Sequence, residues 1–236
     1  MKNSPIQQIS ELTKIYGISE IEIIDLLRKA VTKSSPHKEI EVEVSNQKLI
    51  FYKTFYNRYN ELKREQIKLK VEDKNKINKI FYKLLFKESQ LRIFKNIKDF
   101  QKSNNGVISG EVIGKVANGF KVLTKFGTAY LPFSAIPIAE KNKKIFKKNV
   151  AHYFHINKVT IKMGVLKIVL DRYSKNILLQ DIKEIIDTQE QNLININRDI
   201  GSKITLYVKN KIDKESIKRL SKRYKEQVKV KVLNAW

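Results

Sequence analysis

The chain has 236 residues, of which 48 are Lys or Arg and 24 are Asp or Glu, so its formal net charge is +24. This charge excludes a typical acidic cytosolic enzyme and favours nucleic acid as the partner, with an anionic membrane surface as the second choice. The absence of cysteine excludes a disulfide framework, a zinc ribbon, an iron–sulfur centre and a thiol nucleophile. An AT-rich genome, which favours Lys codons, is an alternative source of part of the charge.

The hydrophobic content of 42% is sufficient for packed cores and excludes a disordered basic tail. The first residues are polar, and the longest nearly uncharged stretches, such as 129–139, contain proline and are too short to span a bilayer. We therefore expect a soluble, cytoplasmic monomer that makes no membrane contact.

The first part of the chain predicts two helices followed by a hairpin. Apolar residues recur at helical spacing over 6–15 and again over 21–31, and Gly17 ends the first of these runs. Apolar and acidic residues then alternate over 40–44, which predicts a strand, and the run 49–56 predicts a second strand after a turn at 46–47. The second run is aromatic on both faces, which indicates core and rim, with a protein contact as the alternative.

A long helical pattern follows. Apolar residues keep a 3.6-residue spacing from 74 to 103 without Gly or Pro, which predicts one long helix, or two helices with a break near Glu88. The sequence Ser-Asn-Asn-Gly at 103–106 is a stop signal and a candidate domain boundary.

The pattern changes to alternation after Gly106. Five short runs predict strands at 107–113, 120–126, 129–133, 150–161 and 165–170. A Lys-rich connector separates the third run from the fourth. Five short strands in this arrangement are typical of a small oligonucleotide-binding (OB) barrel.

The last part of the chain mixes both periodicities. It predicts a helix, a hairpin, a second helix and a final strand, at 177–186, 192–208, 217–224 and 228–232. We see no internal repeat in the sequence.

Residues Gly106 to Glu140 resemble a known family. The segments 106–113, 119–122 and 127–132, followed by Ile136-Pro137, resemble the ribosomal-protein-S-one type of RNA-binding domain. The Leu-Pro and Ile-Pro pairs are similar to the version found in the NusA family of bacterial transcription elongation factors.

The rest of the chain agrees with this resemblance in the order of its elements. The front, with Gly17-Ile18-Ser19, an Ile- and Leu-rich helix and two strands, is similar to the start of the family's polymerase-binding domain. The segment 168–172 resembles its exit from the barrel, and 193–204 resembles the hairpin of its first KH domain. KH domains bind RNA through a Gly-x-x-Gly loop, but the sequence contains no glycine between Lys209 and Tyr224.

These observations predict an α+β multidomain chain. We expect a NusA-like N-terminal domain with a long helix, an S-one-type OB barrel and a degenerate KH-like domain, at residues 1–105, 106–172 and 173–236. The chain is then a short, divergent relative that lacks the Gly-x-x-Gly loop and the second KH domain.

The middle segment has the highest ratio of basic to acidic residues, with 12 Lys and Arg and three Asp and Glu between residues 106 and 172. Rings that stack on bases and cations that meet phosphates are what single-strand binding requires. We therefore predict an RNA-binding surface that comprises Phe120, Lys121, Lys125, Phe126, Tyr130, Phe133 and Arg172, with Lys143 and Lys144 of the connector and Arg219 and Arg223 of the last helix. The alternative is that Phe120 and Phe126 are core residues and that the lysines are solvated.

Other chemistry finds little support in the sequence. His152 and His155 are three apart, which on a strand places them on opposite faces, and no cysteine or carboxylate cluster completes a metal site. We find no nuclease-type carboxylate set and no nucleotide-binding glycine motif. The sequence predicts no enzyme activity and no cofactor.

The resemblance implies a transcription elongation, termination or antitermination factor that contacts RNA polymerase and single-stranded nascent RNA. Two alternatives remain: a general RNA-binding protein that acts on mRNA or ribosomes without polymerase, and a protein-interaction scaffold that has lost RNA binding.

Overall fold

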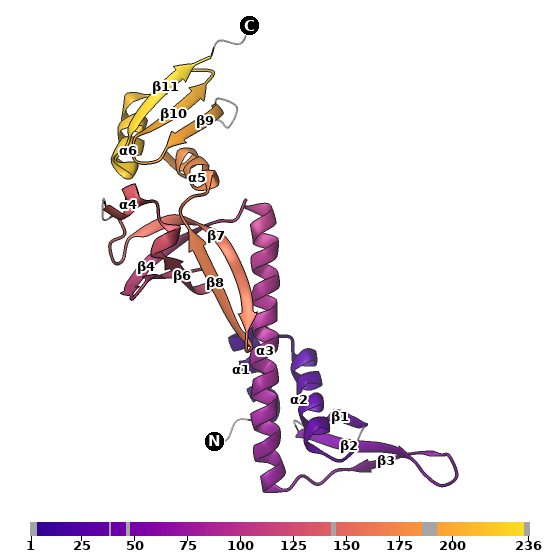
Figure 1. Cartoon of the computed structure of the whole chain (residues 1–236). Coiled ribbons are helices and arrows are strands. Elements are labelled where there is room, and N and C mark those ends of the chain that lie inside the picture. The colour runs from indigo at the N-terminus through magenta and orange to yellow at the C-terminus, as the bar shows by residue number, and fades with distance from the viewer. Residues whose placement is uncertain (1–3, 38, 46–47, 143–144, 186–192, 234–236) are drawn as a thin grey trace. The chain divides into compact units, whose positions relative to one another are not determined.

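The computed structural model describes residues 4–37, 39–45, 48–142, 145–185 and 193–233 (Figure 1). Within these residues the fold is mixed α+β, with six α-helices and three sheets, one of which is a closed five-stranded barrel. The chain forms two compact units. The first contains residues 1–93 and 163–165, and the second contains 94–162 and 166–236. The barrel and the last third of the chain therefore belong to one unit.

The first unit begins with two capped helices, α1 (Pro5–Tyr16) and α2 (Glu20–Ser34). Ser4 and Ser19 each form a capping box, and Gly17 adopts the left-handed conformation that ends α1 (φ 64°). The predicted helices are therefore confirmed, and the reason is local: the caps satisfy the free backbone groups of each first turn.

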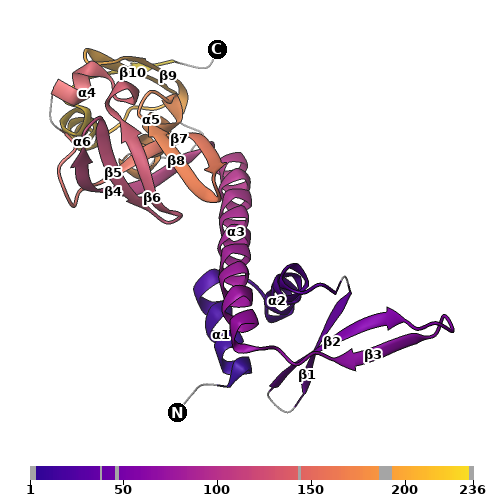
Figure 2. The same cartoon turned by 60° about the horizontal axis from the view of Figure 1, so that its bottom comes forward.

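An antiparallel sheet follows, with the order β1-β2-β3. Its strands are β1 (Ile40–Ser45), β2 (Lys48–Tyr56) and β3 (Leu62–Gln66). Figure 2 shows β2 and β3 side by side up to their connecting turn. The sequence did not predict β3, because all five of its residues are exposed and no apolar alternation marks it. Cross-strand ion pairs support it instead: Arg64 lies 3.1 Å from Glu41 and 2.9 Å from Glu43.

The long helix α3 (Val71–Ser103) is a single helix of 33 residues, without the alternative break near Glu88. In the first unit its residues Ile77, Phe81 and Leu85 join a core with α1, α2 and β1. These three residues are four apart, so they lie along one stripe of the helix. The aromatic strand β2 contributes to the same core through Leu49 and Phe51, which are partly buried.

The barrel of the second unit has the closed order β4-β5-β6-β8-β7. All five of its strands occur where the alternation predicts them: β4 (Val107–Val116), β5 (Gly119–Thr124), β6 (Gly127–Pro132), β7 (Ala151–Lys162) and β8 (Val165–Asp171). Strand β4 pairs antiparallel with β5 and with β7, β5 pairs antiparallel with β6, and β6 pairs in parallel with β8 through Tyr130 and Val169. Between β6 and β7 lie the 3₁₀ turn η1 (Phe133–Ala135) and the short helix α4 (Ile138–Asn142).

The last part of the chain is a three-stranded sheet with the order β11-β10-β9, covered by two helices. Its elements are α5 (Lys175–Ile185), β9 (Leu193–Asp199), β10 (Lys203–Val208), α6 (Lys214–Tyr224) and β11 (Gln227–Val232). Strand β10 pairs antiparallel with β9 and parallel with β11. The predicted sequence of helix, hairpin, helix and strand is therefore confirmed.

A buried ion-pair network connects the barrel segment to this sheet. Glu140 of α4 is 1% exposed and accepts hydrogen bonds from Arg172 Nε at 2.9 Å and from Arg198 Nη2 at 2.9 Å. Arg198 of β9 also pairs at 2.9 Å with Glu226, whose side chain is fully buried. Gly201 allows the β9–β10 turn to lie close to α4, because a Cβ at this position would lie 2.5 Å from the Cβ of Ala139.

Candidate nucleic-acid interface

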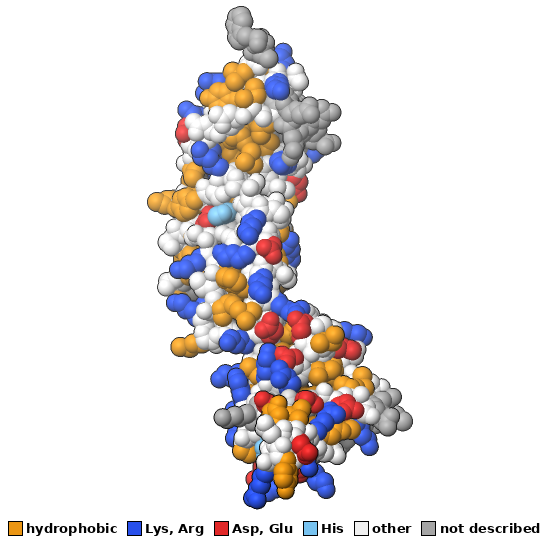
Figure 3. All heavy atoms as spheres, turned by 90° about the vertical axis from the view of Figure 1, so that its right-hand side faces the viewer, with side chains coloured by type: hydrophobic (Ala, Val, Ile, Leu, Met, Phe, Trp, Pro, Cys, Tyr) orange, Lys and Arg blue, Asp and Glu red, His pale blue; other side chains and the backbone are white. Residues whose placement is uncertain are grey.

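The surface of the barrel is more basic than its composition indicates. Glu140 and Asp171 are both buried, and they pair with Arg172 and His155 respectively. Glu111 is the remaining acid of residues 106–172, and it is half-buried. Every lysine of the barrel segment that the structure describes is exposed. Blue Lys and Arg side chains also outnumber red Asp and Glu side chains on the face that Figure 3 presents.

Four half-buried rings form an aromatic cluster at the end of the barrel where β4 turns into β5. The ring of Phe120 lies 5.3 Å from Phe133 and 5.7 Å from Phe146, between centroids. Phe146 lies 5.4 Å from His152. We refer to Phe120, Phe133, Phe146 and His152 as the aromatic cluster. Such rings offer apolar faces to planar ligands.

Two exposed lysines lie over this cluster. Lys115 Nζ is 5.6 Å and Lys141 Nζ is 5.0 Å from the centroid of Phe133. Both distances are within the range of a cation–π interaction. Rings with exposed ammonium groups beside them combine the two contacts that single-stranded nucleic acids make, stacking and charge neutralisation.

The local sequence explains how the cluster forms. Phe120 follows Gly119, where a Cβ would lie 2.3 Å from the carbonyl oxygen of Leu131, so only glycine allows β5 and β6 to approach this closely. Phe133 opens the 3₁₀ turn after β6, and its N–H donates to the carbonyl of Asn118 at 2.9 Å. The two rings are therefore fixed by the same turn region.

His152 is a neutral member of the cluster. Burial, followed by the nearby charges of Arg172 and Arg223, lowers its pKa to about 4. Its Nε2 is buried and has no hydrogen-bond partner among the described residues. At neutral pH the imidazole therefore contributes a ring, not a positive charge.

The outer face of β5 and β6 carries a second pair of predicted residues. Lys121 is directly opposite Tyr130 in the register, and Lys121 is exposed while Tyr130 is half-buried. The Tyr130 hydroxyl donates to the carbonyl of Asn118 at 2.8 Å, which holds the ring at the β4–β5 turn. This face therefore offers a hydrogen-bonded ring beside an exposed cation.

Two other predicted residues lie elsewhere on the barrel. Phe126 packs on Phe100 of α3 with their centroids 5.4 Å apart, and Lys125 Nζ lies 3.6 Å from the ring of Phe100. This pair attaches the β5–β6 turn to the helix, so we do not include Phe126 in the proposed interface.

Arg172 is 4% exposed and is paired with Glu140, and it donates to the backbone carbonyl of Tyr153. This burial contradicts the predicted position of Arg172 on the RNA-binding surface, removes it from the interface and gives it a role in the fold.

The predicted arginines of α6 are engaged in ion pairs. Arg219 pairs with Glu215 at 2.7 Å, and Arg223 pairs with Asp181 at 2.7 Å and with Glu184 at 3.2 Å. The predicted Lys143 and Lys144 lie outside the described residues.

Phe146 and His152 are members of the aromatic cluster that the sequence pattern did not predict. Phe146 could have been found, because Ile145 and Phe146 interrupt a run of lysines, and an apolar pair in such a run indicates an anchor to the core. As expected, the side chains of His152 and His155 have different surroundings. His155 Nδ1 lies 2.8 Å from Asp171 Oδ2, while His152 packs on Phe146. Among the described residues, no group of three or more His, Asp or Glu side chains could hold a metal ion.

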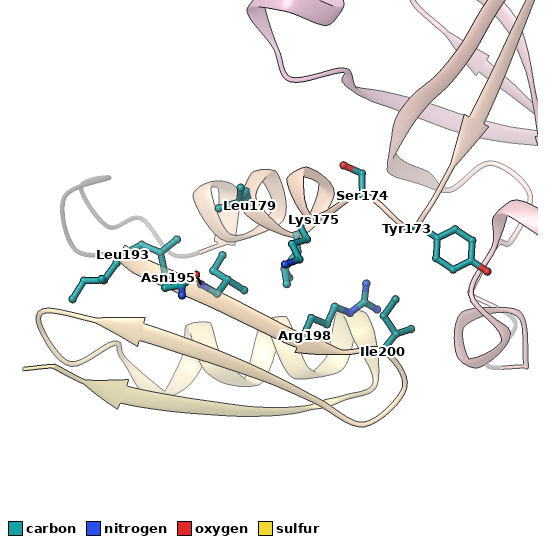
Figure 4. Close-up of a pocket in the computed structure, with 11 residues that line it drawn as sticks. Tyr173, Ser174, Lys175, Leu179, Leu193, Asn195, Arg198 and Ile200 are labelled. Carbon is teal, nitrogen blue, oxygen red and sulfur yellow. Dashed lines mark hydrogen bonds between the residues drawn. The ribbon is translucent and has the colours of Figure 1, made fainter.

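The cavities outside the barrel include two with mostly apolar linings. One, of about 320 Å³, lies between α5 and the edge strand β9 (Figure 4). Its lining is mostly apolar, with Ser174, Lys175, Asn195 and Arg198 as polar members and no carboxylate. The other, of about 840 Å³, is an apolar groove of the first unit along α1, β2 and α3. Ile15, which is 72% exposed, and Tyr82, which is 51% exposed, lie on it.

No protein-family model matches the chain, and no curated protein matches its sequence. Within the described residues, no helix is both long enough and apolar enough to cross a membrane.

Proposed function

We propose that the protein binds single-stranded RNA through its barrel and acts as a NusA-like transcription elongation, termination or antitermination factor. The observation that carries the RNA half is the aromatic cluster beneath Lys115 and Lys141, on a barrel whose acids are mostly buried in pairs. Bases would stack on the rings and phosphates would meet the lysines, with each stacked base contributing about 1–3 kcal/mol.

The strand order supports assignment of the barrel to the OB class. A closed five-stranded barrel with a parallel pair between its third and fifth strands has the connectivity of that class, which binds oligonucleotides on its second and third strands and on the adjoining loops. Phe120, Lys121 and Tyr130 lie on those two strands and Phe133 directly follows the third, while Phe146 and His152 of the aromatic cluster come from the connector and β7.

The last domain supports assignment to a degenerate KH-like class. Strands β10 and β11 are parallel neighbours joined by a helical connection, with β9 on the other side of β10. Only α6 lies in that connection, and residues 209–213, which precede it, contain no glycine. RNA binding by a Gly-x-x-Gly loop is therefore not part of the proposal.

The apolar groove of the first unit supports a protein contact, which we propose is RNA polymerase. A groove with exposed Ile15 and Tyr82 on its lining is suited to an apolar segment of a partner. A protein-interaction scaffold without RNA binding would use the same groove, so the experiments must test the two halves separately.

The RNA half is tested by the salt dependence of binding to a labelled single-stranded RNA. Removal of two phosphate contacts, Lys115→Ala with Lys141→Ala, should lower the slope of log K against log salt by about 1.4. The control, Lys14→Ala with Lys33→Ala, removes two exposed lysines of α1 and α2 and should leave the slope unchanged. Equal slopes for both variants would contradict the proposed interface.

The polymerase half is tested by retention of core RNA polymerase on the immobilised full chain. Ile15→Glu places a charge on the groove and should abolish retention. Ile21→Glu changes a residue of α2 that is 81% exposed and absent from the groove lining, and it should retain polymerase. Intact RNA binding without retention by the unmodified chain would refute the polymerase half and favour a general RNA-binding protein.

A further inference from the structure

The C-terminal sheet has one face covered by helices and one face open. Ile204, Leu206 and Val208 of β10 pack with α5 and α6 in the core of this domain. Because side chains alternate along a strand, Lys203, Thr205 and Tyr207 point to the opposite face. The same alternation applies to β9 and β11, whose partly buried Ile196, Val228 and Val230 belong to the core.

The register arranges the open face in three rows. Each row contains one residue each of β9, β10 and β11 in that order: Asp199, Lys203 and Gln227; Asn197, Thr205 and Lys229; Asn195, Tyr207 and Lys231. All six residues of the two outer strands are exposed. We refer to these nine residues as the open face.

The charge of the open face is positive. It contains three lysines and one acid, and that acid, Asp199, lies 3.4 Å from Lys203 Nζ. Lys229 and Lys231 are two apart on β11, so their ammonium groups lie on one side of the strand, with the spacing of alternate residues. Between them and β9 the face is polar and uncharged: Asn197 is exposed and can donate and accept hydrogen bonds, whereas Thr205 is 7% exposed.

Tyr207 is the aromatic residue of the open face. It lies on the central strand, half-buried, and Lys231 Nζ is 5.5 Å from its centroid. Its register partner on β9 is Asn195, whose side-chain oxygen accepts from the N–H of Ile196 at 2.8 Å. A ring on an open sheet with a cation beside it can stack a base and neutralise a phosphate.

We infer that the open face is a second binding site for a short single-stranded nucleic acid, with Tyr207 as the stacking residue and Lys229 and Lys231 as the phosphate contacts. The site is separate from the barrel and needs no Gly-x-x-Gly loop. The inference extends the proposed RNA binding to a domain that would otherwise have lost it, and its test is arranged so that either can fail alone.

The test measures the affinity of the full chain for a labelled 12-nucleotide RNA and for DNA of the same sequence, at fixed salt. Tyr207→Val, a residue suited to a strand, should weaken binding by about tenfold. Lys229→Glu with Lys231→Glu changes two exposed side chains and leaves the core intact, so it tests the site even if Tyr207→Val is unstable. Circular dichroism checks the fold of each variant.

The matched control is Lys218→Glu with Lys222→Glu. These lysines are exposed on α6, which covers the other face of the sheet, and the control changes the net charge by the same amount. Equal weakening by the two double variants would overturn the inference, because affinity would then follow net charge alone. If the sheet variants bind both RNA and DNA more weakly, the site recognises the bases and phosphates that the two polymers share. If only RNA binding is weaker, the site is specific for RNA.

The outcomes separate the two sites. If the barrel variant Lys115→Ala with Lys141→Ala weakens binding and the sheet variants do not, the proposed function stands and the second site is refuted. If the sheet variants weaken binding and the barrel variant does not, the second site stands and the barrel interface is refuted. If the unmodified chain binds neither polymer, both are refuted.

Discussion

Substitution of Glu140 by Gln should destabilise the second unit more than any conservative surface change. Glu140 is 1% exposed and receives the guanidinium groups of both Arg172 and Arg198. Burial by itself raises its pKa, but the charges and hydrogen bonds of the two arginines outweigh burial and hold the pKa below its ordinary value. The substitution keeps the shape and removes the negative charge between two buried cations.

The expected magnitude follows from the cost of leaving buried charges uncompensated. Breaking a buried pair by removal of one partner costs about 3–5 kcal/mol. This is a large share of the roughly 5–15 kcal/mol by which domains are stable. With a denaturant slope of about 2 kcal/mol per molar, the urea midpoint should fall by about 2 M.

The assay is urea unfolding of the full chain, followed by far-ultraviolet circular dichroism. Glu215→Gln is the control, because Glu215 forms an exposed pair with Arg219 on α6 at 2.7 Å, with its side chain 74% exposed. That change should cost less than about 0.5 kcal/mol. A loss below about 1 kcal/mol for Glu140→Gln would refute the idea that the network holds the barrel segment and the last sheet together.

Three further perturbations test the barrel. Gly119→Ala places a Cβ 2.3 Å from the carbonyl oxygen of Leu131 and should cost about 1–3 kcal/mol in urea unfolding, whereas Gly114→Ala meets nothing within 4 Å and should cost about zero; equal costs would contradict the close approach of β5 and β6. Because the pKa of His152 is about 4 in the folded protein and about 6.5 when unfolded, the unfolded chain binds more protons between these values and stability should fall as the pH is lowered through them. His152→Phe should remove this contribution, at most about 3 kcal/mol before solvent screening reduces it, and identical pH profiles for the two proteins would refute the assignment. Phe146→Ala should detach the Lys-rich connector and accelerate tryptic cleavage there, while Phe86→Ala, on a residue of α3 that is 42% exposed, should leave that cleavage unchanged.

Most of the elements could be predicted because their periodicity is local. The stripe of Ile77, Phe81 and Leu85 marks α3, and the alternation of 40–44 marks β1, because each pattern lies within one element. Strand β3 could not be predicted this way, since its partners Glu41, Glu43 and Lys53 come from other strands and supply ion pairs, which have no periodicity of their own.

The candidate site was predicted in part, for a related reason. The alternating pattern places Phe120 and Phe126 in or beside a strand, but it does not indicate what packs against each ring. In the structure Phe120 packs against Phe133, whereas Phe126 packs against Phe100 of α3. Arg172 is a similar case. Its partner Glu140 lies 32 residues away, and only the folded chain shows that the arginine is buried.

The ion-pair network around Glu140 also affects how the protein would bind an oligonucleotide that is long enough to reach both the barrel and the open face. It joins the barrel segment to the sheet that carries the open face, within one compact unit. A single-stranded nucleic acid that has bound one of the two surfaces would encounter the other surface at an effective concentration of about millimolar. Two weak contacts would then act as one bivalent site. Affinity should then rise abruptly once the oligonucleotide is long enough to reach both, and oligonucleotide length would select among ligands where base sequence does not.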